Sequence, residues 1–269
     1  MKSGTPIPLW QDRLPNDKIG MDSFHPTITP YAIDSPSLSA AIVVLPGGGY
    51  TGRAPHEGEP IAGWLNTIGI SSFVLDYRVA PNRHPIPLFD AQRAIRWVRA
   101  HAAEYGLDPT RVGILGFSAG GHLAATAATR FDGGNPVEKD PIERESSRPD
   151  AAVLCYPVIS FVDEDRHSGS MTNLLGPEPD VSQRRELSAE LQVGSLTPPT
   201  FLWHTAEDGG VPVRNSLIFA DALARNGIPF ALHVYPKGAH GLGLATGSGY
   251  TEQWTEACAG WLKEIGFRA

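Results

Sequence analysis

The chain contains Arg111-Val112-Gly113-Ile114-Leu115-Gly116-Phe117-Ser118-Ala119-Gly120, an apolar run that leads directly into a serine between small residues. The run predicts a buried strand, and the alanine-rich segment 119–129 that follows it predicts a helix. Ser118 then lies at a sharp strand-to-helix turn, and the glycines two residues before and after it leave room for that turn. The turn also places the hydroxyl at the helix N-terminus, which favours developing negative charge. We therefore take Ser118 as a candidate nucleophile.

The alternation of strand and helix continues on both sides of this turn. Short apolar runs predict further strands, and segments with helical periodicity lie between them. The predicted strands are 41–45, 70–77, 111–117, 151–156, 199–204 and 230–235, and the longer predicted helices are 88–105, 212–226 and 251–265. Repeated β-α-β units predict one α/β domain over residues 1–269, with an open, doubly wound, mostly parallel sheet. Ligands of such sheets bind beyond the carboxyl ends of the strands.

Two stretches depart from this alternation. Residues 131–149 are charged and contain several glycines and prolines, which predicts a surface loop. Residues 158–197 separate two predicted strands and contain one plausible short helix, around Gln183–Gln192. Connections of this length within a domain commonly form lids or binding loops. We therefore expect a lid-like insertion over about 158–197.

The overall composition excludes several classes of partner. The chain has 269 residues, 41% of them hydrophobic, and a formal net charge of −7. An acidic surface repels phosphate backbones and anionic lipids, so we expect neither nucleic acid nor a membrane as partner. No long apolar run or signal-peptide core is present, and we expect a cytoplasmic protein. The sequence does not indicate an oligomeric state.

A serine nucleophile needs a base, and the base needs a carboxylate to orient it. In the α/β-hydrolase order the acid and then the histidine follow the serine, each in a loop after a later strand. Asp208 follows the predicted strand 199–204, with Glu207 beside it as the fallback acid. Of the two histidines after Asp208, His233 lies within a predicted strand, whereas His240 lies in a glycine-flanked loop after one. We therefore expect Asp208 to orient His240, and His240 to act as the base.

Acyl transfer also needs donors for the oxyanion of the tetrahedral intermediate. The residue after the nucleophile, Ala119, supplies one backbone N–H group. Gly48 and Gly49, which follow the predicted strand 41–45, are the other candidates, because glycine lets the backbone approach a substrate closely. The loop after these glycines is expected to shape the pocket, and its candidates for substrate binding are Tyr50, His56 and Glu57.

The same glycine run raises an alternative function. Gly47-x-Gly49-x-x-Gly52 after a strand matches the dinucleotide fingerprint of oxidoreductases, and Asp76 ends the next predicted strand. That fingerprint requires a helix to begin at its third glycine. Residues 53–60 contain two prolines and Gly58, which prevent a helix before about Pro60. A phosphate-binding P-loop also fails, because Arg53-Ala54 stands where lysine and serine or threonine are needed.

Metal and thiol chemistry have little support in the sequence. His56-Glu57-Gly58-Glu59-Pro60 lacks the second histidine of a zinc-binding H-E-x-x-H motif. Cys155 and Cys258 both lie in apolar patterns and are expected to pack as small hydrophobic residues. His122, just after the candidate nucleophile, is expected to pack or to form hydrogen bonds. We therefore expect no metal and no cofactor.

Several motifs together resemble a known family. They are Leu45-Pro46-Gly47-Gly48-Gly49-Tyr50, Asp76-Tyr77-Arg78-Val79-Ala80-Pro81 and Gly116–Gly121 with His122. The chain resembles α/β-hydrolase esterases near the hormone-sensitive-lipase-like branch, and over nearly its whole length it is similar to bacterial acetyl xylan esterase-like carbohydrate esterases. The resemblance implies a nucleophile at Ser118, an acid at Asp208, a base at His240 and an oxyanion loop at Gly47–Gly49. Pro46 departs from the lipase-like branch, which has histidine there.

The residues and the resemblance together predict a serine esterase. Its expected reaction is hydrolysis of short acyl esters, above all acetyl esters, on sugars such as acetylated xylo-oligosaccharides. A carboxylesterase for other small esters and a feruloyl esterase remain as alternatives. From a different class, a catalytically inactive hydrolase fold that serves as a binding module also remains.

Overall fold

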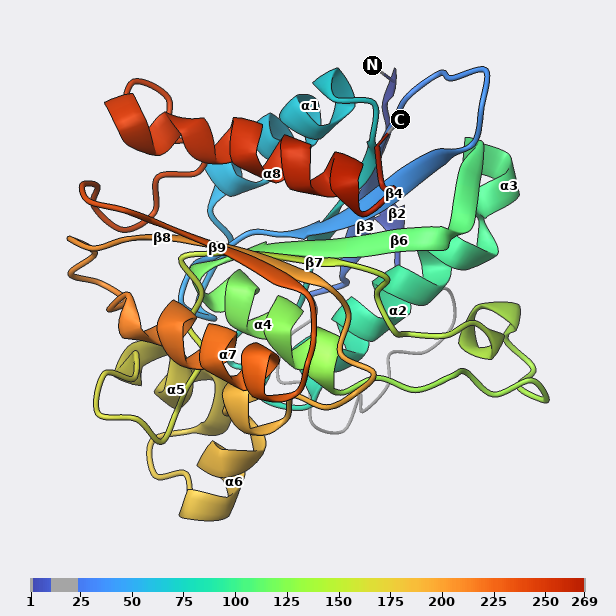
Figure 1. The fold of residues 1–269 in the computed structure, drawn as a ribbon. Coiled ribbons are helices and arrows are strands. Elements are labelled where there is room, and N and C mark those ends of the chain that lie inside the picture. The colour runs from blue at the N-terminus through green and yellow to red at the C-terminus, as the bar shows by residue number, and fades with distance from the viewer. Residues whose placement is uncertain (1, 11–23, 269) are drawn as a thin grey trace.

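The computed structural model describes residues 2–10 and 24–268. Within them a nine-stranded sheet runs through the centre of the molecule, in the order β1-β3-β5-β4-β6-β7-β8-β9, with β2 beside β3 (Figure 1). The strands are β1 (Lys2–Ser3), β2 (Ile7–Pro8), β3 (Thr27–Ala32), β4 (Ser39–Leu45), β5 (Ser71–Asp76), β6 (Leu107–Phe117), β7 (Ala152–Cys155), β8 (Thr200–Thr205) and β9 (Phe230–Tyr235).

The strands from β5 to β9 in this order are parallel, as the sequence predicts, and the prediction of a mostly parallel α/β-hydrolase sheet is confirmed. β1, β2 and β3 add an antiparallel edge that the sequence analysis missed. β3 contains Pro30, which lacks a backbone donor and argues against a strand in sequence. Here its carbonyl accepts a hydrogen bond from Gly4 N (2.8 Å). The strand therefore depends on pairing with distant segments.

Helices cover both faces of the sheet, which explains why the central strands are almost continuously apolar (Figure 1). One face packs against α2 (Ile86–Ala100), α4 (Ser118–Thr129) and α7 (Arg214–Arg225). The other packs against α1 (Glu59–Thr67) and α8 (Trp254–Glu264). The predicted helix 88–105 is in fact two, because the chain leaves helical geometry at His101 before α3 (Ala102–Tyr105).

The segment 158–197 contains α5 (Ser168–Leu175), α6 (Val181–Glu186) and a 3-10 turn at Ala189–Leu191. The predicted helix over 183–192 is therefore wrong in its extent. The Asp180 side chain accepts from Gln183 N, and the Gln183 side chain accepts from Asp180 N, so a capping box starts α6 at Val181. The segment also packs on the domain, since Asn173 Nδ2 donates to Gly49 O (2.8 Å) and Val158 N donates to Ser118 O (3.0 Å).

Other sequence expectations concern the loop 131–149, the cysteines and membrane insertion. The loop contains one 3-10 turn, Pro141–Arg144, which an ion pair from Arg93 to Glu143 (2.7 Å) joins to α2. Cys155 and Cys258 are free and buried, as expected, and burial raises the pKa of both thiols. Within residues 2–10 and 24–268, no helix combines the length and apolarity that crossing a bilayer requires.

Candidate active site

Ser118 occupies a strained turn between β6 and α4. Its φ of +51° lies in the left-handed region, which side chains other than glycine seldom adopt. A Cβ atom on Gly116 would overlap Gly120 O, and one on Gly120 would overlap Leu45 O. The turn thus requires glycine at both positions, because backbone from two elements passes too close for a side chain. The strained geometry is that of a nucleophile elbow.

Three side chains from the loops after β6, β8 and β9 meet at the carboxyl edge of the sheet. Ser118 Oγ lies 2.7 Å from His240 Nε2, and His240 Nδ1 lies 2.7 Å from Asp208 Oδ2. Because the carboxylate can only accept, Nδ1 carries the proton and Nε2 is free to accept the serine proton. The structure therefore brings together the three residues expected from the sequence, in an order of contacts suited to serine nucleophilic catalysis. Glu207, the fallback acid, is exposed.

Asp208 is held by more donors than His240 alone. Its Oδ1 accepts from Gly210 N and Val211 N (both 2.9 Å), and buried His204 places Nε2 3.3 Å from Oδ2. Burial by itself would raise the pKa of this carboxyl group. Hydrogen bonds from His204, His240 and Val211 N outweigh burial and hold the pKa well below its usual range. Asp208 therefore stays ionised and can stabilise a protonated His240.

The glycine loop after β4 offers free backbone donors beside Ser118. Gly47 N is committed to Glu57 Oε2 (2.7 Å). By contrast, the N–H groups of Gly48, Gly49 and Ala119 donate to no acceptor within the part of the chain that the structure describes. Gly48 and Gly49 have φ values of +134° and +63°, which glycine adopts without strain. These three groups remain the candidates for an oxyanion hole.

Tyr50 does not face an open pocket. It is 1% exposed, and its hydroxyl lies 2.8 Å from Nδ1 of His122. The other ring nitrogen of His122, Nε2, lies 2.8 Å from Leu187 O and must donate to that carbonyl. Burial lowers the pKa of His122 to about 4, so the ring is neutral and Nδ1 accepts from the tyrosine hydroxyl. Tyr50 and His122 thus connect the glycine loop, α4 and the segment 158–197.

Neutral His122 gives the fold a defined pH dependence. Its folded pKa of about 4 lies below its unfolded value of about 6.5, so the unfolded chain binds the proton more readily between these values. The contribution of His122 to stability is complete above pH 6.5 and is lost as the pH falls toward 4. We expect the free energy of unfolding to drop over this range by about 3 kcal/mol from this residue.

Urea unfolding at pH 7.5, 5.5 and 4.5 measures the effect. His122→Gln can still hydrogen-bond but does not titrate, and it should show a smaller drop between pH 6.5 and 4. Equal drops in the two proteins would contradict this account. Asp208, whose folded pKa is depressed, acts in a different window, because its contribution is lost below about pH 4.

His56 and Glu57 lie on a 3-10 turn, Pro55–Glu57, between the glycine loop and the His240 loop. His56 is exposed and its Nε2 donates to Gly241 O (2.8 Å). Glu57 is 2% exposed, and both of its carboxylate oxygens accept hydrogen bonds within the protein. Of the three side chains expected to bind substrate, His56 is the one that solvent reaches.

Three residues of the site were missed in the sequence. Tyr156 and His204 lie at the carboxyl ends of β7 and β8, where polar side chains of a parallel sheet gather. That rule could have singled out both of them. Asn173, which donates to the glycine loop, comes from α5 in the segment 158–197. Its run Asn173-Leu174-Leu175-Gly176 is part of the family resemblance and could have singled it out.

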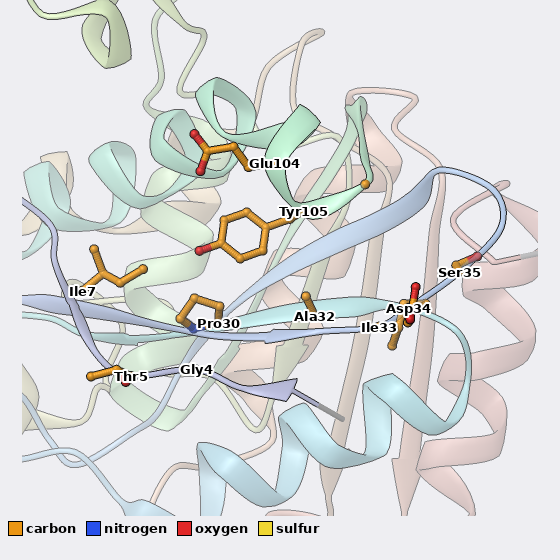
Figure 2. Close-up of a pocket in the computed structure, with 11 residues that line it drawn as sticks. Gly4, Thr5, Ile7, Pro30, Ala32, Ile33, Asp34, Ser35, Glu104 and Tyr105 are labelled. Atoms are coloured by element: carbon orange, nitrogen blue, oxygen red, sulfur yellow. The ribbon is translucent and has the colours of Figure 1, made fainter.

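A cavity of about 580 Å³ lies away from these residues. Figure 2 shows Pro30, Tyr105, Glu104 and Asp34 around it. It borders the end of β3 and the start of β6, and Ala32 of β3 lies beside the amino end of β5, not its carboxyl end. The cavity thus lies beside the amino ends of the parallel strands β5 and β6, whereas Ser118 lies at the carboxyl end of β6. We do not assign the reaction to this cavity.

Two alternatives from the sequence can be compared with the geometry. The helix after the glycine loop, α1, begins at Glu59 and not at Gly52, so no helix N-terminus opens on the third glycine. The dinucleotide fingerprint is therefore not met. Among the described residues, no group of three or more histidine, cysteine, aspartate or glutamate side chains is arranged to hold a metal ion.

Comparison with known proteins identifies the family of the chain. Residues 31–223 match the sequence profile of the BD-FAE family. The chain belongs to the BD-FAE family. A solved structure of an acetyl ester-xyloside bifunctional hydrolase from Caldicellulosiruptor lactoaceticus is 52% identical, with a TM-score of 0.94 over 99% of this chain and 98% of the other.

Two curated relatives of this BD-FAE member are similar over most of its length. An acetylxylan esterase of Xylanibacter ruminicola is 37% identical over 84% of this chain and 45% of its own. Endo-1,4-beta-xylanase B of Butyrivibrio fibrisolvens is 38% identical over 88% of this chain and 38% of its own. The chain thus spans less than half the length of either curated relative.

Proposed function

We propose that this protein is a serine esterase that removes acetyl and other short acyl groups from sugars such as acetylated xylo-oligosaccharides. The observation that carries the proposal is the contact of Ser118 Oγ with His240 Nε2 (2.7 Å), backed by the contact of His240 Nδ1 with Asp208 Oδ2 (2.7 Å). The names of the Xylanibacter and Caldicellulosiruptor relatives support acetyl esters and xylan-derived alcohols.

In the proposed mechanism Ser118 Oγ attacks the ester carbonyl carbon while His240 Nε2 takes the hydroxyl proton. Asp208 keeps the imidazole in the required tautomer and stabilises its protonated form. His240 then gives the proton to the departing sugar oxygen, which leaves an acetyl group on Ser118. A water molecule, deprotonated by His240, attacks this acyl-enzyme and releases acetate.

The oxyanion of each tetrahedral intermediate needs donors that are already in place. The N–H groups of Gly48 and Ala119 are proposed for this role, with Gly49 as a further donor, because none of them donates to the described protein. The N-terminus of α4 adds a favourable field, since Ser118 is the first residue of this 12-residue helix. Removing such a donor typically costs about 10²–10³ in kcat.

Substrate preference is tested by a panel of esters. We expect acetate release from acetylated xylo-oligosaccharides to have a higher kcat/KM than hydrolysis of feruloyl esters or of longer-chain aryl esters. Released acetate and released aryl alcohol are measured with the same enzyme preparation. Faster feruloyl ester hydrolysis would favour a feruloyl esterase, and no sugar preference over aryl acetates would favour a general carboxylesterase.

The Caldicellulosiruptor relative is also named as acting on xylosides, and the present site does not favour that chemistry. Glycoside hydrolysis commonly uses two carboxyl groups, one of which donates a proton while the other attacks or activates water. The buried carboxylates of this site, Asp208 and Glu57, have all four oxygens engaged by protein groups. The proposal is therefore confined to ester cleavage.

A further inference from the structure

Glu57 is a buried carboxylate that the proposed reaction does not use. It follows His56 on the turn Pro55–Glu57 and is 2% exposed. Burying a carboxylate is costly unless donors replace its water. Glu57 has two such donors, Gly47 N at 2.7 Å from Oε2 and Tyr156 Oη at 2.6 Å from Oε1. Its two oxygens thus reach two different segments of the site.

Tyr156 extends this connection to the loop that carries His240. It follows β7 with a φ of +35°, an unusual value for a tyrosine, and is 1% exposed. Burial, together with the nearby Glu57 charge, raises the pKa of Tyr156 well above its usual range, so the phenol stays protonated. Its hydroxyl therefore donates to Glu57 and accepts from Gly243 N (2.7 Å).

Two more contacts join the same segments. The Tyr156 ring packs edge-on against the His240 ring, with centroids 5.1 Å apart and planes at 69°. On the outer side, His56 Nε2 donates to Gly241 O (2.8 Å). The turn Pro55–Glu57 thus holds residue 241 directly through His56 and residue 243 through the Tyr156 hydroxyl that Glu57 binds, and it holds the glycine loop through Gly47.

We propose that Glu57 and Tyr156 are positioning residues that lock the oxyanion loop and the His240 loop to each other. Gly47 N, the Glu57 carboxylate, the Tyr156 hydroxyl and Gly243 N form one continuous chain of hydrogen bonds. This inference rests on the proposed esterase function and assigns to Glu57 a role other than substrate binding.

The chemistry of the chain explains why a carboxylate stands at position 57. Gly47 N and the Tyr156 hydroxyl are both donors, so the residue between them must offer two acceptors. Glutamine has the same shape but offers one acceptor and one NH₂ group. In Glu57→Gln, the side-chain NH₂ group would face either Gly47 N–H or the Tyr156 hydroxyl. The donor that it faces would then lose its acceptor. Isosteric replacement should accordingly fail to restore the connection.

Breaking this chain of hydrogen bonds should lower kcat more than it changes KM, because it displaces groups that stabilise the transition state. Oxyanion donors and the base must both be placed within a fraction of an ångström, and a displacement of about 1 Å can cost about 10²-fold in rate. Neither Glu57 nor Tyr156 offers an open surface to substrate. We expect Tyr156→Phe and Glu57→Gln each to lower kcat by about tenfold to a hundredfold, with KM changed by less than about threefold.

The matched control removes a buried hydroxyl at the other end of the sheet. Ser71 begins β5 and is fully buried, and its Oγ accepts from Ile33 N (3.2 Å) and bonds Ser39 Oγ (3.0 Å). Ser71→Ala thus loses two hydrogen bonds, as Tyr156→Phe does. We expect it to lower Tm comparably while keeping wild-type kcat. Steady-state kinetics are measured with an aryl acetate at a temperature well below the Tm of every variant. The rates are divided by the concentration of active sites, which titration with a fluorophosphonate gives.

The outcomes separate the two proposals. A wild-type protein with no esterase activity overturns the proposed function itself. An active wild type whose Tyr156→Phe and Glu57→Gln variants keep full kcat, with Tm lowered as in Ser71→Ala, overturns the positioning role. If one of the two variants does not fold, the other tests the same chain of hydrogen bonds, because each breaks the contact between Glu57 and Tyr156. A lower kcat at unchanged KM in the folded variant supports positioning, whereas an unchanged kcat contradicts it.

Discussion

Replacing Ser118 with alanine is expected to lower kcat for aryl and sugar acetates by about 10⁴-fold or more. The substitution removes the atom that forms the acyl-enzyme, and the free backbone donors alone cannot replace covalent catalysis. Ser118 has a φ of +51°, which alanine tolerates no worse than serine, and it is 8% exposed. The variant should therefore fold, and its circular dichroism and Tm should stay near those of the wild type.

Covalent labelling tests independently whether Ser118 is the nucleophile. A fluorophosphonate should label the wild type once, at Ser118, and should not label Ser118→Ala. Ser71→Ala, which alters a buried serine remote from the site, should label at the wild-type rate. Near-normal turnover by Ser118→Ala would remove the proposed mechanism. Absence of labelling in the folded wild type would favour the alternative of an inactive hydrolase fold that binds a ligand.

The second large effect is expected for Gly120→Ala, and it concerns stability. Gly120 lies in α4, where alanine would normally gain about 1 kcal/mol in helix propensity. Its Cβ atom would, however, overlap Leu45 O and lie 2.5 Å from Pro46 O. Both are backbone atoms at the end of β4, so no side-chain rotation relieves the clash. We expect a loss of more than about 3 kcal/mol and a Tm lower by about 10 °C, or no soluble protein.

Gly260→Ala supplies the matched control. Gly260 is an exposed glycine of α8, and a Cβ atom there meets nothing within 4 Å. This variant should gain about 0.5–1 kcal/mol, because alanine has the better helix propensity and reduces the entropy of the unfolded chain. Thermal and urea unfolding compare both variants with the wild type. Equal stability of Gly120→Ala and Gly260→Ala would contradict the close contact of Gly120 with the backbone at the end of β4.

Much of the fold follows from local sequence patterns. The predicted parallel strands inside the sheet form because their apolar runs can be covered on both faces, and the helices between them carry an apolar stripe. The sixth, β9, lies at the edge of the sheet and is partly exposed. The antiparallel edge was not predictable in this way. β3, with Pro30 in its middle, takes its conformation from partners on β5 and on the first residues of the chain. The prediction for α6 failed for a different reason, because its start is set by a local capping box between Asp180 and Gln183 that apolar periodicity does not mark.

Part of the candidate site could likewise be predicted from the sequence, and part could not. Ser118 is marked by a local motif, and the order of acid and histidine after it narrows the partners to a few residues. Which of Glu207 and Asp208 turns inward depends on Gly210 N, Val211 N and His204, which hold the Asp208 carboxylate. Sequence spacing carries no information about such contacts.

By itself, the sequence determined the alternation of strands and helices, the glycines at the serine turn and the family to which the chain belongs. These features are local, because they depend on side-chain periodicity and on backbone conformations that only glycine adopts easily. The tertiary structure alone decided that Glu57 is buried and reaches Tyr156 and Gly47, and that Asn173 supports the glycine loop. The contacts of Glu57 with Tyr156 and of Asn173 with Gly49 join segments far apart in the chain, and strand order and packing set their distances.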